Sequence, residues 1–365
     1  MKHISWPSIE QFRNVVHNVT HSAHYVGKDV NGDPIYDISR NKPVLKFEGT
    51  VKLHGTNSSI VISPNCEVQF QSRENIITVE KDNAGFAMFA HLHEQVWQDI
   101  ATDVVSTYND TSGTPRYRGI STQDLVIFGE WCGKGIQKGV AISEIPKMFV
   151  IFGIAFADAE GNKTYLTREE VQGILASYTS VPGSAMPIPI YSIYDFETFE
   201  IEIDFNNPHH SQNLLTEITE LVEAQCPVGR AFGIIGIGEG VVWKSVSEGY
   251  EDSGFWFKVK GEKHSAKSKV KTLAAVDVER IDNIKELAER LAHEPRLEQI
   301  YQQVFNTLNG GEPDIKRTGE FIKAIMADIL KEDLDTLAAS GFTTKDVTGY
   351  VSKIARDYLM KQLCV

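Results

Sequence analysis

A lysine suited to nucleophilic chemistry stands in the segment Lys52-Leu53-His54-Gly55-Thr56-Asn57, where one strand-like run ends and another begins. There a lysine can project from a sheet into a cleft, and Gly55 lets the backbone approach a ligand closely. Free lysine is almost entirely protonated near neutral pH, and only the neutral amine can attack. Nearby positive charge would lower the pKa of the lysine and so favour the neutral amine. The pattern KxHG is short, and it needs support from other segments.

Four further segments carry charged side chains at the boundaries of strand-like runs. They are Ser72-Arg73-Glu74-Asn75, Phe128-Gly129-Glu130-Trp131, Glu239-Gly240-Val241-Val242-Trp243-Lys244 and Phe257-Lys258-Val259-Lys260. Alternation along a strand puts Lys258 and Lys260 on one face and the aromatic Phe255 and Phe257 on the other. The chain therefore combines a candidate nucleophile with acids and cations at strand ends.

These five segments, in this order, resemble the covalent nucleotidyltransferases, which comprise RNA ligases, DNA ligases and mRNA capping enzymes. The sequence is most similar to the nick-sealing, double-strand-repair type of RNA ligase found in phages and kinetoplastid editing complexes. KLHGTN resembles the nucleophile motif of that family, whereas DNA ligases and capping enzymes usually have Asp in the place of His54. FGEWCGKGIQKGV (128–140), EGVVWK and KVK resemble later motifs, and Phe152 in VIFGI matches the aromatic that stacks on adenine. Val51 departs from the pattern, because many relatives have Glu there.

The resemblance, over residues 46–265 and more weakly in the tail, implies an ATP-dependent RNA ligase. Lys52 would carry AMP, and His54 would serve the later sealing step. The residues implied to bind the nucleotide are Lys52, Leu53, Asn57, Arg73, Glu130, Phe152, Glu239, Lys244, Lys258 and Lys260. Lys244, Lys258 and Lys260 would favour the neutral amine of the nucleophile and hold phosphate oxygens. Glu239 would bind Mg²⁺, or possible Mn²⁺, directly or through water, because hard cations prefer oxygen ligands.

The expected fold is α+β. Strand-like runs at 43–71, 125–131, 148–156, 240–245 and 254–260 predict a mixed domain of strands and helices up to about residue 275. The resemblance implies that residues 1–275 form a nucleotidyltransferase domain of ATP-grasp-like ligase type, built from antiparallel sheets with helices. Helices are expected to begin at Trp6-Pro7-Ser8, with Ile9, Phe12 and Val16 on one face, and to span 84–107 and 210–225. A further helix should begin at Thr167 as its cap. Helical spacing continues to the end, which predicts an all-helical C-terminal domain over 276–365.

The net charge of −13 requires any RNA-binding surface to be locally basic. Lys263, Lys267, Lys269 and Lys271 follow the last motif and would form such a footprint, with Arg317, Lys353 and Arg356 as candidates in the tail. The expected partner is RNA, as a nicked duplex or an RNA/DNA hybrid, with no protein partner indicated. The four cysteines form no CxxC pair, and no apolar run could span a membrane, so a reduced cytoplasmic setting is expected, the host cytoplasm for a phage-encoded chain.

Two other classes remain as alternatives. A DNA ligase or a capping-type nucleotidyltransferase would share the catalytic core, although His54 and the helical tail argue against both. A non-catalytic RNA-binding protein could keep a relict pocket, in which Glu130 and Glu239 are ordinary strand-end acids and Phe152 is plain core. Retention of label from α-³²P-ATP on the protein separates a ligase from the non-catalytic alternative.

Substitution of the nucleophile gives the first prediction. Lys52→Ala and Lys52→Arg should both abolish a covalent AMP adduct, because arginine keeps the charge but cannot become a neutral amine at working pH. The measurement is transfer of label from α-³²P-ATP to the protein. An acid-labile, alkali-resistant adduct on the Lys52→Arg variant would show that another residue is the nucleophile.

Overall fold

The computed structural model describes residues 1–108, 117, 119–180, 188–261, 284–339 and 343–363. The chain divides into two compact units. The first comprises Met1–Asn206 with Glu217–Val259, and the second comprises Asn207–Thr216 with Lys260–Val365. The expected domain boundary at residue 275 and the footprint lysines Lys263, Lys267, Lys269 and Lys271 lie outside the described residues.

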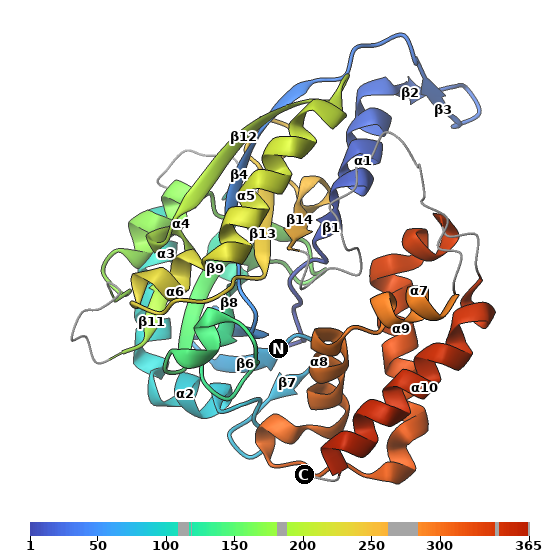
Figure 1. Cartoon of the computed structure of the whole chain (residues 1–365). Helices are drawn as coiled ribbons and strands as arrows, with labels where there is room; N and C mark the ends of the chain where they lie inside the picture. The colour runs from blue at the N-terminus through green and yellow to red at the C-terminus, as the bar shows by residue number, and fades with distance from the viewer. Residues whose placement is uncertain (109–116, 118, 181–187, 262–283, 340–342, 364–365) are drawn as a thin grey trace. The chain divides into compact units, whose positions relative to one another are not determined.

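The first unit contains a mainly antiparallel sheet, here called the first sheet (Figure 1). Its strands, in spatial order, are β1 (Glu10–Gln11), β14 (Phe257–Lys260), β13 (Gly240–Ser245), β4 (Val44–Lys52) and β12 (Thr198–Asp204). One face packs on α1 (Phe12–His24), where the rings of Phe12 and Phe47 lie 4.8 and 5.3 Å from that of Phe257. Since side chains alternate along a strand, Lys52 and Lys258 extend from the opposite face.

A second sheet lies in the same unit. Its strands, in order, are β10 (Lys163–Tyr165), β9 (Met148–Ala157), β8 (Asp124–Cys132), β5 (Thr56–Ile62), β6 (Val68–Ser72) and β7 (Ile76–Ile77), and β11 (Ile190–Ser192) also pairs with β9. The helices α2 (Phe86–Leu92) and α3 (Glu94–Tyr108) cover one face, where Phe149 meets Phe86 and Trp97. The apolar strands β8 and β9 are buried, as their composition predicts.

The two sheets are joined directly by the nucleophile motif. Lys52 is the last residue of β4, and Thr56 is the first of β5, so Leu53, His54 and Gly55 cross from one sheet to the other. Trp6 packs on Phe128 of the second sheet and stacks on Trp256, which precedes β14 of the first. The inner faces of the two sheets therefore face each other, with the nucleophile motif at their junction.

Two helix predictions were wrong in their limits. The first helix begins at Phe12 and not near Trp6, and it buries Phe12, Val15 and Val19, because Trp6 packs between the sheets and residues 10–11 pair with β14. The helix expected over 84–107 is two helices that break at His93. The His93 ring bonds the carbonyl of Phe89, and the Trp97 indole donates to that of Ala90, so side chains occupy the last carbonyls of α2.

Other predicted elements agree in part with the structure. The strand expected over 254–260 begins only at Phe257, because Ser253–Phe255 form a 3₁₀-helix, and β12 was not predicted. Thr167 caps α4 (Arg168–Leu175) through a capping box with Glu170. The predicted helix near 210–225 is α5 (Gln212–Ala224), which is followed by α6 (Pro227–Ala231). The strands β2 (Tyr25–Lys28) and β3 (Pro34–Tyr36) pair as a hairpin (Figure 1).

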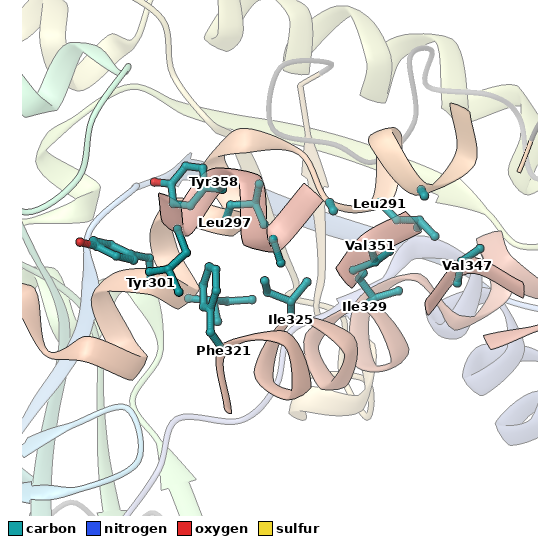
Figure 2. Packing of buried hydrophobic residues seen from close by; sticks show 14 of the residues in the cluster. Leu291, Leu297, Tyr301, Phe321, Ile325, Ile329, Val347, Val351 and Tyr358 are labelled. Atoms are coloured by element: carbon teal, nitrogen blue, oxygen red, sulfur yellow. The ribbon is translucent and has the colours of Figure 1, made fainter. Parts of the chain in front are cut away.

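Besides the start of α5 and the last residue of β14, the second unit contains four α-helices within the described residues from 284 onward. They are α7 (Ile284–Leu291), α8 (Glu294–Phe305), α9 (Thr318–Ala339) and α10 (Thr344–Leu363). Figure 2 shows their apolar side chains, among them Leu297, Phe321 and Val351, meeting in one core. Buried Arg296 donates to Asp328 at 2.8 Å and to Asp333 at 2.5 Å, and so ties α8 to α9. No helix of the described residues is long and apolar enough to cross a membrane.

A glycine pair tests the packing of β8 on β9. A Cβ at Gly129 would lie 2.5 Å from the ring of Phe149, whereas a Cβ at Gly173, on the exposed side of α4, meets nothing within 4 Å. Gly129→Ala should lower the free energy of unfolding by about 1–3 kcal/mol through overpacking. The control Gly173→Ala should raise it by about 0.5–1 kcal/mol. Urea unfolding of both variants measures these changes, and equal effects would contradict the close packing at Gly129.

Candidate active site

Lys52, His54 and Glu239 meet at the junction of the two sheets. The Lys52 Nζ lies 2.7 Å from Glu239 Oε1, and His54 Nδ1 lies 3.3 Å from Glu239 Oε2. The backbone pairing of β4 with β13 places Gly240 opposite Lys52. Because Glu239 directly precedes Gly240, this pairing brings the acid next to the lysine. Glu239 is only 4% exposed, so its carboxylate is held by these two cationic or polar partners instead of by bulk water.

Glu130 and Gln137 fix the backbone of the nucleophile motif. Gly55 N donates to Glu130 Oε1 at 2.9 Å, and Gln137 Nε2 donates to the Gly55 carbonyl at 3.3 Å. A Cβ at Gly55 would lie 2.5 Å from the Trp131 carbonyl, so this position requires glycine. Asn57 pairs directly with Glu130 in the β5–β8 register. The loop after Lys52 is thus anchored on β8 through both its amide and its carbonyl.

Glu130 also interacts electrostatically with Lys52 and Glu239. Burial, assisted by the negative charge of Glu239, raises its pKa to about 7, against the opposing effects of Lys52, the Gly55 amide and Arg73. Arg73 itself is exposed at the end of β6, where its charge still reaches Glu130. The structure therefore brings Lys52, Asn57, Glu130 and Glu239 into one site, with Arg73 at its border.

Lys244 and Phe152 lie together at a second position between the sheets. The β8–β9 register shifts at Phe128/Gly129, so Phe152 has no partner in the ladder, and its carbonyl accepts from Lys244 Nζ at 2.9 Å. The ammonium lies 5.0 and 5.1 Å from the ring centres of Trp6 and Trp256, and burial lowers its pKa to about 8. Lys244 thus links the two sheets here, and a contact with phosphate would require these interactions to open.

Lys258 extends from the same face of the first sheet as Lys52, because the Phe257 ring is buried against Trp243 and Phe47 on the other face. Alternation along β14 gives Lys260 the direction of Lys258. Leu53 is buried beside the nucleophile. These positions are compatible with the phosphate and base contacts expected from the sequence, and those roles remain predictions.

Three residues of this region were not predicted from the sequence. Gln137 lies inside the 128–140 motif, so its position was an available signal for the contact with Gly55. Trp6 and Trp256 are far apart in the chain, and nothing in their local sequence indicates that they stack at 5.2 Å beside Lys244. Only the packing of the two sheets brings them together.

The residues fit a metal ion held jointly with a nucleotide. Among the described residues, no group of three or more His, Cys, Asp or Glu side chains could hold a metal alone. Mg²⁺ commonly binds through one or two carboxylates together with substrate phosphates and water. The buried Glu239 carboxylate beside Lys52 can supply that single protein ligand.

Facing antiparallel sheets with a lysine, two acids and further lysines at their junction define a nucleotidyltransferase-like protein of mixed α+β fold. The family model for RNA ligase matches residues 45–260, which is more than half of the chain. The chain therefore belongs to the RNA ligase family.

Solved structures of Naegleria gruberi RNA ligase are similar to this chain at low sequence identity. A lysine-to-methionine variant with AMP and Mn and the enzyme with PPi each match at 15% identity and a TM-score of 0.40. A lysine-to-alanine variant with ATP and Mn matches at 15% identity and a TM-score of 0.39. Each match covers 71% of this chain and 56% of the Naegleria chain. No curated protein matches this chain.

The raised pKa of Glu130 gives a pH-dependence prediction for the nucleotide-free protein. Because its folded-state pKa of about 7 exceeds the usual 4.5, the folded protein binds this proton more tightly than the unfolded chain. The free energy of unfolding of the wild type should therefore fall relative to that of Glu130→Gln as the pH rises from about 4.5 to about 7. Urea unfolding at several pH values measures the difference, with surface Glu67→Gln as the control. Parallel curves for wild type and Glu130→Gln would contradict the assignment.

Proposed function

We propose that this chain is an ATP-dependent RNA ligase that joins RNA 3′-hydroxyl and 5′-phosphate ends. The main observation behind this proposal is the ion pair between Lys52 Nζ and Glu239 Oε1, 2.7 Å apart. It lies at the junction of two facing sheets in a chain of the RNA ligase family. Glu130, at the same junction, supplies a carboxylate that can accept hydrogen bonds from a ribose. ATP with Mg²⁺ or Mn²⁺ would be the cofactors.

In the first step Lys52 Nζ attacks the α-phosphorus of ATP. The bond to the β-phosphate oxygen breaks, pyrophosphate leaves, and the phosphoramidate of lysyl-AMP forms. Lys52 lies in an ion pair with Glu239, so its amine must leave this pair and give a proton to solvent before it attacks. A divalent ion bound by Glu239 would neutralise phosphate charge and compete with Lys52 for the carboxylate. Lys258 and Lys260 would stabilise the charge on the phosphates.

In the second step an oxygen of the RNA 5′-phosphate attacks the AMP phosphorus and releases the Lys52 amine. In the third step the 3′-hydroxyl of the other strand attacks the 5′-phosphorus, and AMP leaves. His54 is proposed to act in sealing, and its 3.3 Å contact with Glu239 keeps it at the junction after the lysine is released. Phe152 would stack on adenine, and Asn57, Arg73 and Leu53 would position the nucleotide.

The substrate is proposed to be a nick in duplex RNA or in an RNA/DNA hybrid, in a cytoplasmic setting. Residues 1–275 would carry the nucleotide site, and the helical domain from 276 would position the RNA. Sealing requires both strand ends to be held within reacting distance, and a separate domain can contribute that grip. The alternatives are a DNA ligase or capping-type enzyme on the same core and a non-catalytic RNA-binding relative.

A sealing assay with His54→Ala tests the function and divides its steps. The variant should form lysyl-AMP at a near-normal rate, because Lys52 and Glu239 remain, but should seal a pre-adenylylated RNA nick roughly 100-fold more slowly, the range for loss of one catalytic contact. Wild type and Lys52→Ala are compared on RNA, hybrid and DNA nicks.

Wild type that forms no lysyl-AMP and seals no nick would refute ligase activity. Equal preference for DNA nicks would favour the DNA ligase alternative. A His54→Ala variant that seals a pre-adenylylated nick at the wild-type rate would remove His54 from the proposed chemistry.

A further inference from the structure

The solvent-facing side of α10 carries an unusual set of side chains. Lys345, Gly349, Lys353 and Arg356 are all exposed, and they recur at spacings of four, four and three residues. These four residues are here called the α10 stripe. The other side of α10 buries apolar side chains such as Val347 and Val351 in the core of the second unit (Figure 2). The stripe is therefore not needed to hold the helix in place.

The stripe is narrow and continuous. At 3.6 residues per turn its four residues fall within about 80° of the helix circumference, and at 1.5 Å per residue they extend about 16 Å along the axis. This length equals several phosphate steps of a nucleic-acid strand, which lie about 3.4 Å apart along the axis. The three cations, Lys345, Lys353 and Arg356, can contact phosphates several steps apart on one strand.

Gly349 supplies an independent observation. It lies in the interior of a 20-residue helix, yet a Cβ there would meet nothing within 4 Å. Glycine in a helix interior is less stable than alanine, so neither packing nor helix formation accounts for this residue. A position without a side chain lets another backbone approach closely, and here it lies between Lys345 and Lys353.

The stripe gathers three exposed basic side chains in a chain with net charge −13. Asp346 and Asp357 border the stripe on one side, and the Asp346 carboxylate is held at 2.6 Å by both the amide and the hydroxyl of Thr343. Arg317, another basic candidate in the tail, is already engaged by Glu320 and by the Val304 carbonyl. Its guanidinium also lies over the Phe305 ring, which makes it a structural link.

We propose that the α10 stripe docks the sugar–phosphate backbone of the RNA substrate, with Gly349 at the point of closest approach. This inference rests on the proposed function, and it names the surface with which the helical domain holds RNA. Phosphate contacts fix position without reading sequence, which suits an enzyme that must act at breaks of any sequence.

Charge reversal tests the stripe in the full chain. The triple variant Lys345→Glu, Lys353→Glu, Arg356→Glu should bind nicked duplex RNA roughly 100-fold more weakly, and the slope of log affinity against log salt should fall by about 2–3. Lys323→Glu with Lys331→Glu, two exposed lysines of α9, is the matched control and should change affinity much less. Fluorescence anisotropy measures binding, and lysyl-AMP formation should stay at the wild-type level.

The variant Gly349→Ala separates an effect on RNA contact from an effect on the stability of helix α10. The variant should raise the melting temperature by a few degrees, because alanine favours the helix, and should still weaken RNA binding several-fold. Gly319→Ala, at an exposed helical glycine of α9, is the control that should leave RNA affinity unchanged.

If the triple variant binds RNA as tightly as the α9 control, while wild type forms lysyl-AMP and seals nicks, the docking inference is overturned and the proposed function stands. Retained RNA affinity in Gly349→Ala would overturn the role of Gly349. Loss of lysyl-AMP formation in wild type would instead refute the function, independently of the α10 variants.

Discussion

The antiparallel pairing of β4 with β13 is the constraint on which the candidate site depends. It places Gly240 opposite Lys52 and therefore sets Glu239 2.7 Å from the lysine amine. The same lysine ends one sheet just before Thr56 begins the other, so the ion pair stands where the sheets join. A shift of one residue in this register would reverse the faces of the paired side chains and separate the acid from the lysine.

In the proposed chemistry, the pair also gives the lysine a resting position. Its Nζ lies 2.7 Å from the Glu239 carboxylate and must leave that contact before it can reach the α-phosphorus. Binding of a nucleotide with its metal would recruit Glu239 as an oxygen ligand and release Lys52 at the moment when the electrophile is present. Lys244 has a different role. It contacts Phe152, Trp6 and Trp256, and so connects the two sheets.

The acidic net charge places a second constraint on the protein. Under the proposed function, RNA is bound by local positive charge, and the α10 stripe is the surface proposed for it. The core of the second unit is built from apolar side chains and from the buried pairs of Arg296 with Asp328 and Asp333. Contacts made by its exposed helix faces would therefore not disturb the packing of this core.

The sequence by itself determined the candidate nucleophile and the main strands. Lys52 is recognisable because a motif is a local pattern, and β8 and β9 because buried strands read as continuous apolar runs. The limits of the first helix and the break at His93 were missed, since packing of Trp6 and side-chain bonds to backbone carbonyls override helical periodicity. The 128–140 motif marked the position of Gln137, but its bond to Gly55 is a finding of the structure. Only the tertiary structure decided that Trp6 and Trp256 enclose Lys244, because these contacts join residues that no spacing relates.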